Sequence, residues 1–147
     1  MVKYIAIVLF IAIVGCKNSQ TQTLNQGLKG QVLWLEGNFM PGPGQNKKGE
    51  PVEREIYIYD VINAKDLQEK GNKLYEMPDQ EPIAIAQSNS DGLFEVSLPA
   101  GRYSVFTKEE EGLFANAFDG EMNLNPITVE AQKFKEVILK INYKAAY

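Results

Sequence analysis

Few side chains in this chain can do chemistry, and its single cysteine stands first among them. The 147 residues include one cysteine, Cys16, and no histidine. Without histidine there is no Ser-His-Asp or Cys-His catalysis, no His-Glu-x-x-His zinc site and no imidazole base for neutral pH. A lone cysteine excludes an internal disulfide, a redox pair and a thiolate zinc cluster. We therefore expect a protein that is not an enzyme.

Carboxylates form two further candidate clusters. The first is the run Glu109-Glu110-Glu111 before Gly112, and the second pairs Asp119 with Glu121. Carboxylate oxygens suit calcium, but neither cluster has the alternating ligands of a calcium-binding loop. Paired carboxylates also serve glycosidases, where they need a cleft between them. Solvated turns are the favoured interpretation, with no metal and no cofactor, and a minor hydrolase is the least favoured function.

The charge balance bears on the partner. Fifteen basic residues face nineteen acidic ones, for a formal net charge of −4. Nucleic-acid binding requires concentrated lysine and arginine to neutralise phosphates. A nucleic-acid partner is therefore not expected.

The N-terminus has the pattern of a secretory signal peptide. Lys3 supplies a positive charge, the run from Ile5 to Val14 is apolar throughout, and Gly15 is a small residue directly before Cys16. As a helix this run reaches about 15 Å, roughly half of the 30 Å hydrocarbon core of a membrane. The pattern predicts a signal peptide over residues 1–15 rather than an ordinary spanning helix.

The run Ile13-Val14-Gly15-Cys16 resembles the lipobox of bacterial lipoproteins, usually Leu-Ala-Gly-Cys or a close variant. The resemblance implies cleavage after Gly15, a diacylglycerol thioether on Cys16 and acylation of the new N-terminus. Two or three buried acyl chains anchor a protein effectively permanently. The alternative is a structural cysteine within a membrane helix.

A polar tether follows, so that residues 16–27 comprise the lipidated cysteine and a flexible link. Lys17 occupies the position where aspartate is the best-known inner-membrane retention signal of enteric bacteria. Its presence there favours the outer membrane of the cell envelope, on the periplasmic face or at the surface.

Beyond the tether, apolar residues alternate with a period of two. The pattern predicts six or seven short strands and an all-β, antiparallel β-sandwich in one domain over residues 28–147. Turns are expected at Asn89–Gly92 and Leu98–Gly101. Two stretches, Asn38–Pro51 and Asn63–Pro82, look like long loop insertions, the second with a helical turn or two.

The sixteen residues from Ser90 to Val105 resemble the middle of carboxypeptidase regulatory-like domains. The shared phrase is an Asp-Gly turn, a phenylalanine (Phe94), a Leu-Pro-Ala-Gly turn and a tyrosine (Tyr103). The resemblance implies a seven-stranded transthyretin-like sandwich with two consecutive hairpins, and Phe94 and Tyr103 in one core. Such domains accompany other modules and are usually not catalytic. The enzymatic transthyretin-like branch, which hydrolyses 5-hydroxyisourate, uses histidines that this chain lacks.

Tyr57 and Tyr59 are the remaining candidate contact residues. They lie on the strand face opposite Ile56 and Ile58, so one pair must face away from the core. Outward tyrosines can stack on sugar rings or anchor a protein. The alternative, which we favour, is that they stabilise the sheet or lie beneath the long loop.

These observations lead to one main functional hypothesis and one alternative. The main hypothesis is a lipid-anchored, non-enzymatic β-sandwich module of the cell envelope with an interaction or structural role. The alternative is a carbohydrate-binding module that uses exposed aromatic side chains. The expected partners are the membrane, through the lipid, and an envelope protein or glycan.

Overall fold

The first and last strands of the fold lie side by side and run in the same direction. In the computed structural model, which describes residues 25–44 and 47–147, β1 (Gly27–Asn38) pairs in parallel with β11 (Phe134–Ala146). Their register shifts once, between Trp34 and Glu36. The expectation of a purely antiparallel sandwich is therefore wrong. Alternating apolar residues identify a strand, but they do not encode the direction of its neighbour.

β1 is also the central strand of the smaller sheet. On its other side, β7 (Leu93–Ser97) and β2 (Glu50–Pro51) both pair with it in the antiparallel sense. Among the described strands β11 pairs with β1 alone, so β11 forms one edge of this sheet. Half of the backbone groups of an edge strand point away from its partner.

The larger sheet has seven strands around β8 (Gly101–Glu109), which pairs with β3, β9 and β10. Its order is β4-β5-β9-β8-β3-β6, and β10 joins β8 beside β9. The bounds of the remaining strands are β3 Glu55–Asp60, β4 Glu69–Gly71, β5 Leu74–Tyr75, β6 Ala84–Gln87, β9 Gly112–Phe114 and β10 Pro126–Val129.

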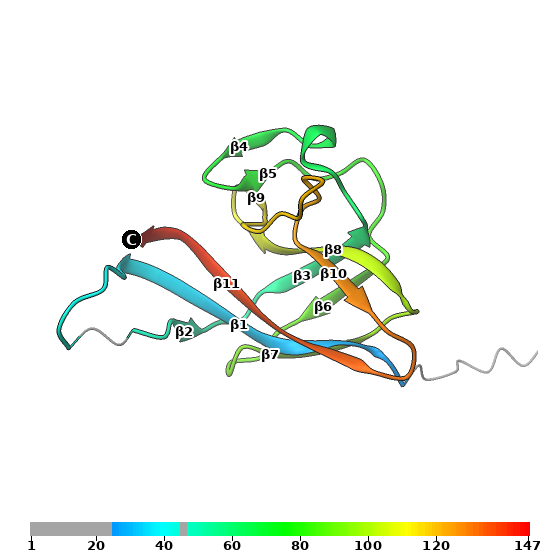
Figure 1. Cartoon of the computed structure of the whole chain (residues 1–147), viewed down its shortest axis with the longest axis horizontal. Helices are drawn as coiled ribbons and strands as arrows, with labels where there is room; N and C mark the ends of the chain where they lie inside the picture. Colours follow the sequence, from blue (N-terminus) through cyan, green and yellow to red (C-terminus); the bar gives the residue numbers. More distant parts are fainter. Residues whose placement is uncertain (1–24, 45–46) are drawn as a thin grey trace, which may run out of the picture.

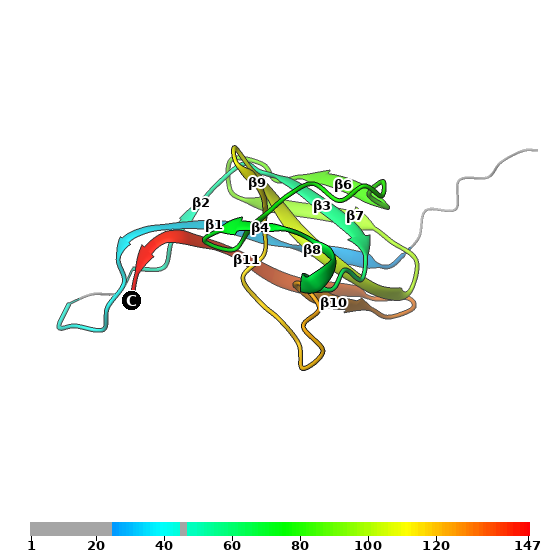
Figure 2. The ribbon, with the colours of Figure 1, turned by 90° about the horizontal axis from the view of Figure 1, so that it is seen from above.

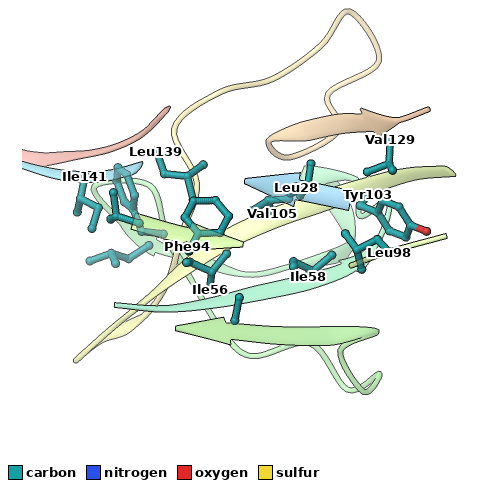
Figure 3. Close-up of a cluster of buried hydrophobic side chains, with 14 residues drawn as sticks. Leu28, Ile56, Ile58, Phe94, Leu98, Tyr103, Val105, Val129, Leu139 and Ile141 are labelled. Atoms are coloured by element: carbon teal, nitrogen blue, oxygen red, sulfur yellow. The ribbon is translucent and has the colours of Figure 1, made fainter. Parts of the chain in front are cut away.

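The two sheets pack face to face in a sandwich-like, all-β arrangement. Figure 3 shows Phe94 and Leu139 of the smaller sheet beside Ile56 and Val105 of the larger one. Phe94 and Tyr103 belong to this same buried cluster, as predicted. A second buried cluster covers the opposite face of the larger sheet.

The two predicted turns connect the sheets instead of closing hairpins. Asn89–Gly92 leads from β6 in the larger sheet to β7 in the smaller one, and Leu98–Gly101 leads back to β8. The prediction of two consecutive hairpins is thus wrong. Turn residues specify a local reversal of the backbone, whereas the pairing partner of each strand depends on contacts that are distant in sequence.

The two insertions differ from each other. The described part of Asn38–Pro51 is largely exposed and ends in the short strand β2. The stretch Asn63–Pro82 contains the 3-10 turn η1 (Ala64–Asp66) and the β4–β5 pair, which extends the larger sheet. The described residues therefore form eleven strands where six or seven were expected. The additional strands, β2, β4, β5 and β10, have two to four residues each, too few for a recognisable period.

Candidate functional site

The predicted lipid attachment site lies outside the described residues, as do Gly15, Cys16 and the tether up to residue 24. The first strand of the fold, β1, begins at Gly27. From there β1 and β11 run together toward the C-terminus at the other end of the molecule (Figures 1 and 2). At about 3.3 Å per residue, the far end of β1 is roughly 36 Å from its start. We call these the tether end and the distal end. No helix among the described residues is long and apolar enough to cross a membrane.

Tyr57 and Tyr59 stack on each other rather than presenting two open rings. Their ring centroids are 6.4 Å apart at an interplanar angle of 23°. Tyr59 is 1 % exposed and meets Phe106 edge-on at 5.9 Å, while Tyr57 is half-buried. Ile62, just before the second insertion, and Leu67, within it, pack in the same cluster. The tyrosines therefore pack against residues at the border of the second insertion and not beneath Asn38–Pro51. Burial raises the pKa of Tyr59.

A buried carboxylate forms the most distinctive polar cluster between the sheets. The Glu109 side chain is 3 % exposed, and Arg54 Nε lies 3.2 Å and 3.3 Å from its two oxygens. Tyr143 of β11 donates a hydrogen bond of 3.1 Å from its hydroxyl to Glu109 Oε2. Three segments distant in sequence thus meet at one carboxylate, which we call the Glu109 cluster.

Strand alternation explains why Glu109 is buried beside two exposed glutamates. The inward positions of β8 are Tyr103, Val105, Thr107 and Glu109, two residues apart. Glu110 and Glu111 form the turn into β9, as predicted for this acidic run. The prediction of a solvated turn did not separate Glu109 from its neighbours, although extending the alternation from Tyr103 would have done so.

The electrostatics of the Glu109 cluster favour a protonated tyrosine. Burial, followed by the negative charge and hydrogen bond of Glu109, raises the pKa of Tyr143 to about 12. The positive charge of Arg54 acts to lower the pKa of Tyr143, and the Arg54 guanidinium forms an ion pair with Glu109. Since both partners are engaged, the cluster ties the sheets together and presents no free base or nucleophile.

Trp34 joins this cluster to the distal surface. Its ring meets Tyr143 edge-on at 5.2 Å, and Arg54 and Lys144 each lie 5.6 Å from its centroid. Trp34 is half-buried and packs against the core. It also lines an open hollow of about 530 Å³ together with Phe39.

The second acidic cluster forms a turn, as expected. Asp119 accepts hydrogen bonds of 2.9 Å from the backbone nitrogens of Glu121 and Asn123, and its other oxygen contacts Arg102. The side-chain and backbone hydrogen bonds of Asn123 are the largest causes that lower the pKa of Asp119, to about 2. Within residues 25–44 and 47–147, no group of three or more acidic or metal-binding side chains is placed to hold a metal ion.

No known protein family and no curated protein matches this chain.

Proposed function

We propose that this protein is a lipid-anchored, non-enzymatic β-sandwich module of the cell envelope with an interaction or structural role. The observation that carries the proposal is Cys16, which follows Gly15 and an apolar run and precedes a polar tether. Cleavage after Gly15 and lipidation of Cys16 would attach the domain to the membrane, with the outer membrane as the expected location.

The geometry of the domain supports an anchored module. The tether joins the fold at the first residues of β1, so all eleven strands follow the attachment point. The conspicuous aromatic and basic side chains, such as Trp34 and Lys144, lie toward the distal end. A partner that binds these side chains would contact the end of the domain opposite the start of β1.

We also propose the transthyretin-like fold of carboxypeptidase regulatory-like domains. Support comes from the Asp91-Gly92 turn, from Phe94 and Tyr103 in one core, and from two sheets packed face to face. A solved structure whose strands superpose in the same order would establish this fold, and a different strand order would refute it.

The carbohydrate-binding alternative receives no support from the tyrosines that suggested it. Tyr59 is 1 % exposed and its ring is covered by protein. A hydrolase is not supported either, because Glu109, the buried carboxylate, is paired with Arg54.

Metabolic labelling with palmitate tests the anchor. The full chain should incorporate the label and sediment with the outer membrane, whereas Cys16→Ala should do neither. Asn18→Ala, which keeps the cysteine, is the matched control and should behave like the unmodified chain. Equal labelling of Cys16→Ala, or an unlabelled soluble product from the unmodified chain, would refute the proposal.

A further inference from the structure

The edge of β11 that faces away from β1 is long and has no strand beside it in the described part of the chain. β11 has 13 residues and pairs there with β1 alone. The Gly27 N–H donates to the Lys133 carbonyl at 3.1 Å, and in a parallel ladder backbone groups alternate between the two sides of a strand. The odd-numbered residues in this part of β11 therefore direct their backbone groups to β1. The even-numbered ones, Glu136, Ile138 and Lys140, direct theirs to the free edge.

A side chain of the larger sheet marks where this free edge ends. The Asn116 amide donates to the Lys140 carbonyl at 3.2 Å. Because this carbonyl points away from β1, the contact lies on the free side of β11. A carbonyl oxygen has two lone pairs and can accept a second hydrogen bond. The open stretch of the edge therefore runs from Phe134 to Lys140.

The outward side chains of this stretch are complementary to themselves. Leu139 and Ile141 face the core, whereas Glu136, Ile138 and Lys140 are exposed, Ile138 to 62 %. A carboxylate thus stands two residues before an exposed isoleucine, and an ammonium group stands two residues after it. In an antiparallel pair of two such strands centred on Ile138, Glu136 of one copy lies opposite Lys140 of the other. Opposite charges at facing positions stabilise a strand pair.

We propose that two copies of this chain pair through the free edges of β11 and form a two-fold symmetric dimer. The strands run antiparallel with Ile138 at the axis, so that the two smaller sheets join into one. The Ile138 N–H of each copy donates to the Ile138 carbonyl of the other, and Glu136 and Lys140 exchange backbone hydrogen bonds in the same way. A two-fold contact requires a surface that is complementary to itself, and this order of charges provides one.

The charges also select this register over its neighbours. With Glu136 at the axis, two carboxylates would face each other, and with Lys140 at the axis two ammonium groups would. An axis at Val137 or Leu139 would place a charged side chain opposite Ile138. Among these registers, the one centred on Ile138 pairs apolar with apolar and acid with base.

The antiparallel arrangement has a consequence for the anchor proposed above. The starts of the two β1 strands lie at opposite ends of the dimer, because β1 is parallel to β11. Two anchored copies would therefore lie with β11 along the membrane surface. Residues 16–26 span at most about 37 Å when extended, which lets both ends reach the membrane. This orientation rests on the proposed anchor, whereas the pairing of β11 does not.

Sedimentation equilibrium of the full chain in a density-matched detergent tests the dimer, because it measures the mass of the protein alone. The contact is small, so we expect a monomer in dilute solution and a dimer at about 0.5 mM. Lys140→Glu places like charges opposite each other at two points and should raise the dissociation constant roughly 10-fold. Lys135→Glu makes the same change of charge on the other face of β11 and should leave it within about 2-fold.

A charge exchange provides a test that misfolding cannot imitate. Glu136→Lys should weaken the dimer as Lys140→Glu does, although it also removes a 3.1 Å contact with Lys29 within the same copy. Combining Glu136→Lys with Lys140→Glu restores opposite charges across the axis. The double variant should therefore dimerise more tightly than either single variant.

Amide hydrogen exchange, followed by NMR, locates the contact. The Ile138 amide gains a partner in the dimer, whereas the Leu139 amide faces β1 in either state. Exchange at Ile138 should slow several-fold between dilute and concentrated protein, with no change at Leu139. Cys16→Ala in the same detergent should dimerise like the unmodified chain, which separates this proposal from the anchor.

Four outcomes would overturn the proposal. They are a monomer at every concentration, equal dimerisation of Lys140→Glu and the unmodified chain, no gain in the double variant, and a dimer whose Ile138 amide stays unprotected. A monomeric Cys16→Ala beside a dimeric unmodified chain would also do so, because the lipid and not β11 would then hold the copies together.

Discussion

Tyr143 donates a 3.1 Å hydrogen bond to Glu109 and so joins β11 of the smaller sheet to the end of β8 in the larger sheet. Arg54, the residue just before β3, forms an ion pair with the same carboxylate. This polar link closes the sandwich toward its distal end. Farther toward the tether end, a cavity lined in part by Thr107 opens between β11 and β8. The two sheets are thus joined by polar contacts at one level and, beside the cavity, by apolar packing at the next.

Arg54→Ala should destabilise the protein more than an ordinary surface substitution does. Loss of the guanidinium leaves the Glu109 charge buried, with the Tyr143 hydroxyl as its remaining side-chain partner. We expect the free energy of unfolding in urea to fall by roughly 3 kcal/mol. The exposed Lys65 provides the control, since Lys65→Ala should change it by less than about 0.5 kcal/mol. Equal effects of the two substitutions would contradict a structural role for the ion pair.

Tyr143→Phe should make stability less sensitive to alkaline pH. The pKa of Tyr143 is raised from 10.0 to about 12 in the folded chain, so its contribution is fully present below pH 10 and is lost between pH 10 and 12. Urea midpoints measured across this window should decline less steeply in Tyr143→Phe than in the unmodified chain. The difference between the two curves isolates Tyr143 from the other tyrosines. Parallel curves would show that the pKa of Tyr143 is not raised in the folded chain.

Asp119→Asn should change the response to acid. The pKa of Asp119 is lowered from 3.8 to about 2, so its stabilising contribution is present above pH 3.8 and disappears as the pH falls toward 2. Between these values the urea midpoint of the unmodified chain should fall more steeply than that of Asp119→Asn. Asp79→Asn, which removes one exposed carboxylate, serves as the control and should follow the unmodified chain. Identical slopes for all three would contradict the prediction.

Gly92→Ala should cost more than the same change at Gly44. Both glycines have positive φ, 71° and 78°, but an added Cβ at Gly92 would lie 2.4 Å from the Val32 carbonyl oxygen. At Gly44 it would meet nothing within 4 Å. We expect the free energy of unfolding to fall by about 1 kcal/mol for Gly44→Ala and by roughly 2 kcal/mol or more for Gly92→Ala. Equal losses would mean that the turn moves away from β1 at no cost.

Much of the fold could be predicted from local pattern. The alternation in β1, β3, β7, β8 and β11 identified each as a strand, and Phe94 and Tyr103 were correctly assigned to one core. The parallel β1–β11 pair and the β4–β5 extension were not predicted. Pairing direction depends on contacts across most of the chain, and two-residue strands carry no periodic pattern.

The polar features between the sheets were harder to predict. The sequence shows three adjacent glutamates that look alike, and it shows Thr107 as one residue of an alternating strand. Only the folded chain brings Arg54 and Tyr143 to Glu109 and leaves the Thr107 hydroxyl without a partner in the described residues. These contacts form between side chains of the two sheets. The spacing of those residues along the sequence does not predict which of them will meet.

By itself, the sequence determines the chemical inventory of this protein: one thiol just after an apolar run, no imidazole, and apolar residues that alternate with a two-residue period. These properties are local, since composition and adjacent residues are enough to define them. The tertiary structure decides which carboxylate is buried, which tyrosines are covered and where a cavity remains. Burial and pairing are properties of surfaces brought together by folding, and they exist only once the two sheets have met.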